Sequence, residues 1–118
     1  MKTILVAEDN ESNYILMYYI LKSKYNLVRA VNGQEAVNKM AEGGIDLILM
    51  DLKMPVMDGL EATKVIKEKY PEMPIVVLTA NAFDSDREAA LKVGANEFLT
   101  KPLDYKLTLD TIARFIGE

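Results

Sequence analysis

The sequence predicts an α/β domain built on a parallel sheet. Short apolar runs alternate along the chain with longer segments that have the period of a helix. Two of the runs, at residues 47–50 and 75–78, contain only apolar residues, which is typical of strands covered on both faces. Because strands that alternate with helices join as βαβ units, we expect a doubly wound sheet with helices on both sides.

Five strands and five helices are expected. The strands are predicted at residues 3–7 (TILVA), 27–31 (LVRAV), 46–50 (DLILM), 75–79 (IVVLT) and 97–100 (EFLT). The helices are predicted at residues 11–24, 34–42, 59–69, 85–93 and 104–116. Residues that favour helix ends support these limits, namely Asn32, Asp58, Asp84 or Ser85, and Asp104 at the starts, and Gly43, Pro71 and Gly94 at the stops.

We expect one domain, residues 1–118, because no linker, repeat or low-complexity segment interrupts the pattern. Half of the residues are hydrophobic and 27% are charged, as in ordinary globular proteins. The net charge of −4 argues against direct binding of nucleic acid or of an anionic membrane surface. No apolar stretch approaches the roughly 20 residues that span a bilayer. The start, MKTILVAEDN, becomes acidic too early for a secretory signal, so we expect a cytoplasmic protein without membrane insertion.

Two residue types are absent, and their absence limits the possible chemistry. Without cysteine there is no disulfide, no thiolate nucleophile and no cysteine metal site. Without histidine there is no Ser-His-Asp triad, no imidazole general base and no histidine-bound zinc. Any chemistry must therefore use carboxylates, hydroxyls, amines and a metal ion that prefers oxygen ligands.

Polar side chains of complementary chemistry stand at the ends of four predicted strands. Glu8 and Asp9 follow the first strand and Asp51 follows the third, while Thr79 ends the fourth and Lys101 follows the fifth. In open parallel sheets, ligands bind beyond the carboxyl ends of the strands, so we expect these groups to share one rim. One such residue alone could simply cap a loop, but four strand ends together indicate a site. Three neighbouring carboxylates repel one another unless a cation is present, and oxygen donors suit Mg²⁺ or Mn²⁺.

These segments resemble the receiver (CheY-like) domain of bacterial response regulators over the whole chain. The matching segments are VAEDN with its acidic pair, LMDLKMPVMDG with the acceptor aspartate, VVLTANAF with the hydroxyl, and FLTKPL with the lysine and proline. The segments EDN, MPVMDG and TANAF are particularly similar to receivers attached to hybrid histidine kinases. The resemblance implies a flavodoxin-like (βα)5 fold with strand order 2-1-3-4-5.

The resemblance also implies roles for the acidic residues. Asp51 is the phosphoacceptor, which receives a phosphoryl group from a phosphohistidine on a histidine kinase or a histidine phosphotransfer domain. Asp9 and Asp51 bind Mg²⁺ (or Mn²⁺) directly, with the backbone carbonyl of Lys53 as a further ligand. Glu8, which stands where many members have aspartate, reaches the metal either directly or through water, because its extra methylene group allows both. Lys53 and Asn81 flank the phosphoryl group and tune its lifetime, unless they are plain loop residues. Such a domain is a signalling phosphoacceptor that assists its own phosphotransfer and autodephosphorylation, and not an enzyme.

A conformational switch is implied as well. Thr79 and Lys101 contact two phosphoryl oxygens in the family, the metal contacts the third, and the peptide bond between Lys101 and Pro102 is cis. Phosphorylation draws Thr79 toward Asp51, and Phe98, at the aromatic switch position, turns inward. The surface formed by the fourth helix, the fifth strand and the fifth helix then binds a downstream protein or effector domain, or forms a phosphorylation-dependent homodimer. A plain core aromatic is the alternative interpretation of Phe98.

The first predicted helix is almost entirely apolar through NYILMYYIL. An outward apolar strip usually marks a partner site, and the family docks its phosphodonor helices here. We therefore expect the histidine phosphotransfer partner to contact this strip, unless the tyrosine rings merely lie over neighbouring side chains. The expected core face comprises Leu16, Met17, Ile20 and Leu21, and the outward strip comprises Tyr14, Ile15 and Tyr18, with Tyr19 beside it.

Other protein classes fit less well. A phosphatase of the haloacid dehalogenase type also uses a strand-end aspartate, but it needs a second carboxylate two residues later, where this chain has Lys53. A nucleotide-binding module would carry GxxxxGK[ST] or GxGxxG after the first strand. A flavodoxin-like redox protein would need a phosphate-binding loop there, whereas this chain has the acidic EDNESN. A receiver that serves only for docking would not need the intact set of Asp9, Asp51, Thr79 and Lys101.

Overall fold

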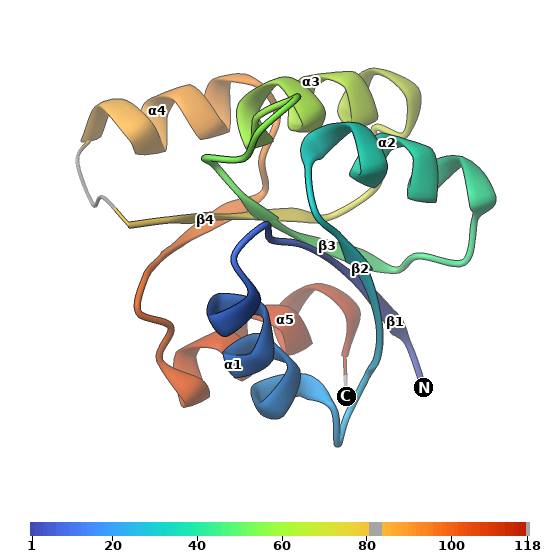
Figure 1. Cartoon of the computed structure of the whole chain (residues 1–118), viewed down its shortest axis with the longest axis vertical. Helices are drawn as coiled ribbons and strands as arrows, with labels where there is room; N and C mark the ends of the chain where they lie inside the picture. Colours follow the sequence, from blue (N-terminus) through green and yellow to red (C-terminus); the bar gives the residue numbers. More distant parts are fainter. Residues whose placement is uncertain (81–83, 118) are drawn as a thin grey trace.

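A computed structural model describes residues 1–80 and 84–117. This part of the chain forms a five-stranded parallel sheet in the order β2-β1-β3-β4-β5, with five helices on its two faces (Figure 1). The strands are β1 (Thr3–Ala7), β2 (Asn26–Ala30), β3 (Leu47–Asp51), β4 (Ile75–Thr79) and β5 (Glu97–Thr100). The helices are α1 (Glu11–Leu21), α2 (Gly33–Glu42), α3 (Gly59–Lys69), α4 (Asp84–Lys92) and α5 (Tyr105–Ile116). The predicted flavodoxin-like fold and strand order are confirmed.

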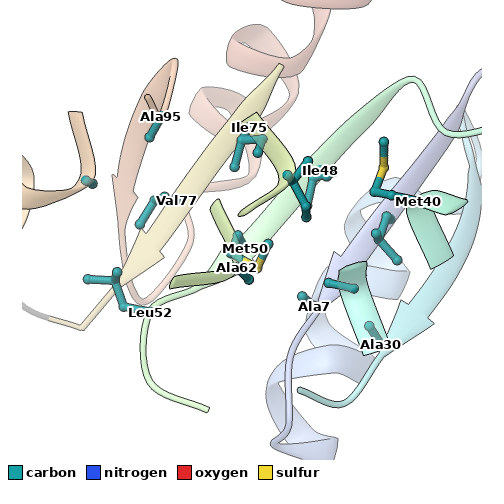
Figure 2. Close-up of a cluster of buried hydrophobic side chains, with 14 residues drawn as sticks. Ala7, Ala30, Met40, Ile48, Met50, Leu52, Ala62, Ile75, Val77 and Ala95 are labelled. Atoms are coloured by element: carbon teal, nitrogen blue, oxygen red, sulfur yellow. The ribbon is translucent and has the colours of Figure 1, made fainter. Parts of the chain in front are cut away.

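The sheet separates two hydrophobic cores. Because successive side chains of a strand point to opposite faces, alternate residues of one strand enter different cores. Ile48 and Met50 of β3 lie in the cluster drawn in Figure 2, which includes residues of α2, α3 and α4, whereas Leu47 and Leu49 pack against α1 and α5. All five residues of β3 are buried, which agrees with the unbroken apolar run in the sequence. No helix within the described residues has the length and apolar character needed to cross a membrane.

Two strands are displaced by one residue from their predicted limits. β3 begins at Leu47 and not at Asp46, because the Asp46 carboxylate accepts a hydrogen bond from the backbone N–H of Thr3 (2.8 Å) and anchors the turn before the strand. The strand therefore includes Asp51, which pairs with Leu78 of β4. β2 likewise starts one residue earlier than predicted. The acidic side chain at residue 51 is thus part of the sheet and not of the following loop.

The first helix is shorter than predicted, and its core face is narrower. It ends at Leu21, and the turn that follows directs Tyr25 into the core, where its hydroxyl donates to the backbone oxygen of Gly117 (3.0 Å). Met17, Ile20 and Leu21 are buried as predicted. The prediction for Leu16 is wrong, because this side chain is 48% exposed. The half-buried Tyr14, one turn before the buried set, packs against that core instead.

The loop after β3 folds back so that its last part packs against the end of β3. The side chain of Asp58 caps α3, and the backbone N–H of Gly59 donates to the carbonyl of Leu52 (2.8 Å). A Cβ atom on Gly59 would collide with the backbone carbonyl of Asp51, so no other residue fits here without a backbone shift. At the outer side of the same loop, Val56 is 82% exposed and has a φ of 69°, a conformation that β-branched residues rarely adopt.

Candidate functional site

Four strands bring the predicted site residues to one edge of the sheet. Asp51 and Thr79 are the last residues of the neighbouring strands β3 and β4. The backbone N–H of Lys101 donates to the carbonyl of Thr79 (2.7 Å), which continues the pairing of β5 with β4. The side chains of Asp51, Thr79 and Lys101 line one cavity of about 300 Å³, together with Leu52, Lys53 and Ala80. The acceptor, the hydroxyl and the amine that the sequence predicted therefore share a pocket.

The Lys101 amine lies between two buried carboxylates. Its Nζ donates to Oε1 of Glu8 at 2.8 Å and to Oδ1 of Asp51 at 2.9 Å. The Glu8 side chain is 1% exposed, and its second oxygen accepts a hydrogen bond from the backbone N–H of Asn10 (3.2 Å). Ionised groups that leave water need a partner of opposite charge, so Lys101 is the counterion of both carboxylates.

These contacts shift the proton affinities of the site. Burial raises the pKa of the Glu8 carboxyl, and although the hydrogen bond from Lys101 opposes this effect, the negative charge of Asp51 adds to it. For Lys101, burial lowers the pKa, but the hydrogen bonds with Glu8 and Asp51 and the charges of both carboxylates raise it overall. The amine therefore keeps its proton at neutral pH, and its positive charge is available to an incoming anion.

A third carboxylate completes an oxygen-rich cluster. Asp9 is exposed at the start of the turn after β1, and one oxygen from each of Glu8, Asp9 and Asp51 lies within 4.8 Å of the others. Carboxylate oxygens are the ligands that Mg²⁺ prefers, so this donor set fits a hard divalent cation. Lys53 is exposed two residues after Asp51 and lines the cavity that Asp51, Thr79 and Lys101 share.

The remaining predicted residues lie close to the site or on the surfaces assigned to them. Phe98 is half-buried against the core under α4, and the Arg87 guanidinium lies 5.8 Å from its ring centroid. The peptide bond between Lys101 and Pro102 is cis, the geometry that the resemblance implies. Asn81 lies outside the described residues.

The outer face of α1 is apolar and exposed. Ile15 and Tyr18 are 45% and 42% exposed, and Tyr19 beside them is 62% exposed. Tyr14 does not face fully outward as expected, because it is half-buried and its ring is covered by the Arg29 guanidinium at 4.5 Å from the centroid. The exposed part of the predicted strip is therefore Ile15 and Tyr18.

Sequence reasoning did not identify Arg29, which contacts the acidic turn. Its Nε and Nη2 donate to the backbone carbonyl of Glu8 at 3.3 and 3.2 Å, and its Nη1 forms an ion pair with Glu11 at 2.8 Å. The contact spans 21 residues of sequence, so no local pattern predicts it. The only signal in the sequence is a charged residue inside the otherwise apolar strand LVRAV.

Comparison with known proteins identifies the family. The sequence model of the response regulator receiver domain matches residues 4–113. The chain belongs to this family. It is a receiver domain of two-component signalling, and the pocket formed by Glu8, Asp9 and Asp51 fits the phosphoacceptor site of such a domain.

Relatives of this receiver domain occur within signalling kinases and in solved structures. Hybrid signal transduction histidine kinase M of Dictyostelium discoideum is 37% identical over 121 residues, which cover 96% of this chain but only 5% of the kinase. The receiver domain of sensor histidine kinase PA1611 from Pseudomonas aeruginosa PAO1, which coordinates a magnesium ion in its active-site cleft, is 37% identical with a TM-score of 0.91 over 99% of this chain and 98% of that one. The receiver domain of Saccharomyces cerevisiae Ssk1, solved with the histidine phosphotransfer protein Ypd1, is 36% identical with a TM-score of 0.91 over 98% and 88%.

Replacement of Lys101 by methionine should lower the free energy of unfolding by about 3 kcal/mol at neutral pH in metal-free buffer, because it leaves the buried carboxylates unpaired. The loss should shrink at mildly acidic pH. The pKa of Glu8 is already raised in the folded protein, so acid protonates Glu8 there first and removes the unpaired charge. Urea denaturation followed by circular dichroism at both pH values measures the effect.

Lys53→Met is the control for this experiment, since Lys53 is an exposed lysine at the same cavity. It should change the free energy of unfolding by less than about 0.5 kcal/mol at either pH. An equal loss for Lys101→Met at both pH values would contradict the role of Lys101 as counterion.

Proposed function

We propose that this receiver domain accepts a phosphoryl group on Asp51 from a phosphohistidine, in a Mg²⁺-dependent reaction, and then switches its output surface. The donor is a histidine kinase or a histidine phosphotransfer domain. The observation that carries the proposal is the shared pocket in which the Asp51 carboxylate, the Thr79 hydroxyl and the Lys101 amine converge beside two further carboxylates. Membership in the receiver family supports it.

The proposed transfer needs position and charge more than nucleophilic strength. An oxygen of Asp51 forms a bond to phosphorus while the N–P bond of phosphohistidine breaks, and the imidazole nitrogen leaves with the electron pair. The transition state of such a transfer is loose, so alignment and charge neutralisation supply most of the acceleration. Asp51 is held in line by its pairing within the sheet. The Thr79 hydroxyl donates to one phosphoryl oxygen. The Lys101 amine leaves the Asp51 carboxylate and donates to a second phosphoryl oxygen.

Asp9 and Asp51, with the backbone carbonyl of Lys53, would hold the metal ion. When bound, Mg²⁺ neutralises the carboxylates and the transferring group. The oxygen cluster and the magnesium ion of the related PA1611 receiver support this assignment, and Mn²⁺ suits the same ligands. Glu8 would act through water, since both of its oxygens already accept hydrogen bonds. In autodephosphorylation the same groups would orient a water molecule, and Lys53 at the mouth of the pocket would tune its access.

The proposed switch runs from β4 to β5. Thr79 is the last residue of β4. Phe98 on β5 pairs with Val77, which lies two residues before Thr79 on β4. Movement of Thr79 toward a phosphoryl group would open space that the Phe98 ring can enter, which would alter the surface of α4, β5 and α5. Arg87 over the ring and the ion pair between Arg114 and Glu97 (2.9 Å) belong to this surface. A downstream protein, an effector domain or a second copy of the chain would bind there.

The proposed docking surface for the phosphodonor is the outer face of α1. Its exposed apolar side chains, Ile15 and Tyr18, stand one helical turn apart and lie on the helix that begins beside the acidic turn. The related Ssk1 receiver was solved with a histidine phosphotransfer protein, which supports a partner of this class.

Incubation with acetyl phosphate and Mg²⁺ should add one phosphoryl group to the protein, detected by intact mass. Asp51→Asn should abolish the gain, because the amide cannot form the acyl phosphate, and removal of Mg²⁺ with a chelator should reduce it strongly. Asp58→Asn, which alters an exposed aspartate outside the proposed metal set, should leave it intact. If neither acetyl phosphate nor a phosphorylated histidine protein modified the wild-type chain, the proposed function would be wrong.

Phe98→Ala should leave phosphorylation of Asp51 unchanged but weaken the response of the output surface. Hydrogen exchange in α4, β5 and α5, measured before and after phosphorylation, should change less than in the wild type, as should phosphorylation-dependent binding at this surface. Tyr70→Ala is the matched control, because Tyr70 is another half-buried aromatic of the same core outside this surface. An unchanged exchange response in Phe98→Ala would count against the switch.

Ile15→Ser combined with Tyr18→Ser should slow phosphoryl transfer from a histidine phosphotransfer protein by about tenfold or more, because it removes apolar contacts at the docking face. Transfer from acetyl phosphate should keep its rate, since the small donor needs no docking. Tyr105→Ser removes another exposed tyrosine, on α5, and should affect transfer from neither donor. Equal slowing with both donors would refute the docking surface.

A further inference from the structure

We propose that Arg29 is a positioning residue for phosphotransfer, which fixes the peptide group between Glu8 and Asp9 and thereby places the Asp9 carboxylate in the metal cluster. This inference rests on the proposed function, because Arg29 would hold in place one residue of the proposed metal and phosphoacceptor site. Arg29 stands on β2, at the outer edge of the sheet, and does not itself line the cavity at Asp51.

The peptide group after Glu8 lies where the sheet ends. Regular pairing of β1 with β2 stops at Ala7 and Ala30, and the N–H of Glu8 adds one more bond to the carbonyl of Ala30 (2.9 Å). β2 ends at Ala30, so the backbone pairing with β1 goes no further. The carbonyl of Glu8 instead receives two bonds from the Arg29 side chain, at 3.3 and 3.2 Å. The guanidinium thus replaces a backbone donor at the end of the ladder.

The guanidinium is itself held in place by the start of α1. Glu11, in the first turn of that helix, binds Nη1 at 2.8 Å, and the Tyr14 ring lies under the planar group at 4.5 Å. Only 22% of the Arg29 side chain remains exposed. Arginine suits this role because its planar fork donates several bonds in fixed directions and stacks on aromatic rings at the same time. Arg29 therefore links β2, the β1–α1 turn and the start of α1.

The Arg29 contacts act mainly on Asp9. The Glu8 side chain is already fixed by Lys101 and by Asn10, whereas Asp9 is exposed. The carbonyl that Arg29 grips belongs to the peptide group whose N–H is that of Asp9. Rotation of this group would carry the Asp9 carboxylate away from the oxygen of Asp51, which now lies within 4.8 Å. Loss of the Arg29 hydrogen bonds should therefore weaken metal binding more than it affects the reactivity of Asp51.

The test is Arg29→Met, which keeps the aliphatic stem and removes the hydrogen bonds. Mg²⁺ binding, measured by isothermal titration calorimetry without a phosphodonor, should weaken by about tenfold, as is typical when a group that orients a ligand is lost. The Mg²⁺ concentration that gives half the maximal rate of phosphorylation by acetyl phosphate should rise by the same factor, while the rate at saturating Mg²⁺ should be kept.

Arg114→Met is the matched control, because Arg114 also pairs with a glutamate (Glu97, 2.9 Å) and lies over an aromatic ring (Phe115, 5.0 Å), but on α5. It should bind Mg²⁺ like the wild type. Arg29→Lys is a second variant that keeps the charge beside Glu11 but lacks the fork, so it should show most of the same loss even if Arg29→Met folds poorly.

Wild-type Mg²⁺ affinity in the folded Arg29 variants would overturn the assignment to Arg29 alone. The proposed function fails separately, when the wild-type chain takes no phosphoryl group from any donor. An equal loss of Mg²⁺ affinity in Arg114→Met would also overturn the inference, because the loss would then reflect a general destabilisation of the fold and not the contacts of Arg29.

Discussion

Two buried carboxylates, Glu8 and Asp51, share one counterion, the Lys101 amine that lies between them. Glu8 follows β1 and Asp51 ends β3, whereas the amine comes from Lys101 after β5. In the observed strand order, the lysine side chain must cross the end of β4 to reach its partners. It therefore passes the Thr79 position, and this crossing brings the hydroxyl, the amine and the acceptor into one pocket.

The same electrostatic constraint also favours a bound cation at this site. With three carboxylates and one lysine, the cluster carries an excess of negative charge that only a cation relieves. In the proposed mechanism, a metal ion would supply the missing positive charge and would allow the Lys101 amine to exchange a carboxylate for a phosphoryl oxygen. The groups proposed to contact a phosphoryl group would then be in place before the transfer, so that little reorganisation would accompany it.

Much of this arrangement follows from the sequence by simple rules. Parallel strands place their carboxyl ends at one edge, so residues after four different strands could be grouped without knowledge of their contacts. The unbroken apolar run before Asp51 likewise predicted a strand buried on both faces. The strand order and the cis peptide bond came from the resemblance to a family and not from the pattern itself.

Features that depend on contacts between distant segments were not predictable. The bond from Thr3 to Asp46 sets where β3 begins, and it joins residues 43 positions apart. Periodicity alone could not decide whether Leu16 or Tyr14 would complete the core face of α1, because both lie beside the buried stripe. The Arg29 contacts could not be predicted for the same reason, because no local sequence pattern marks a guanidinium that binds a distant backbone carbonyl.

The close approach of Gly59 to the Asp51 carbonyl limits how this loop can vary. Gly59 does not line the pocket at Asp51, yet it is restricted to a hydrogen side chain because it packs against the backbone carbonyl of Asp51. A library that diversified the loop to alter partner choice would have to keep glycine at position 59, while the exposed position 56, three residues away, has a φ of 69° and would favour glycine or asparagine. A position restricted to glycine and a solvent-exposed position thus lie three residues apart in the same loop.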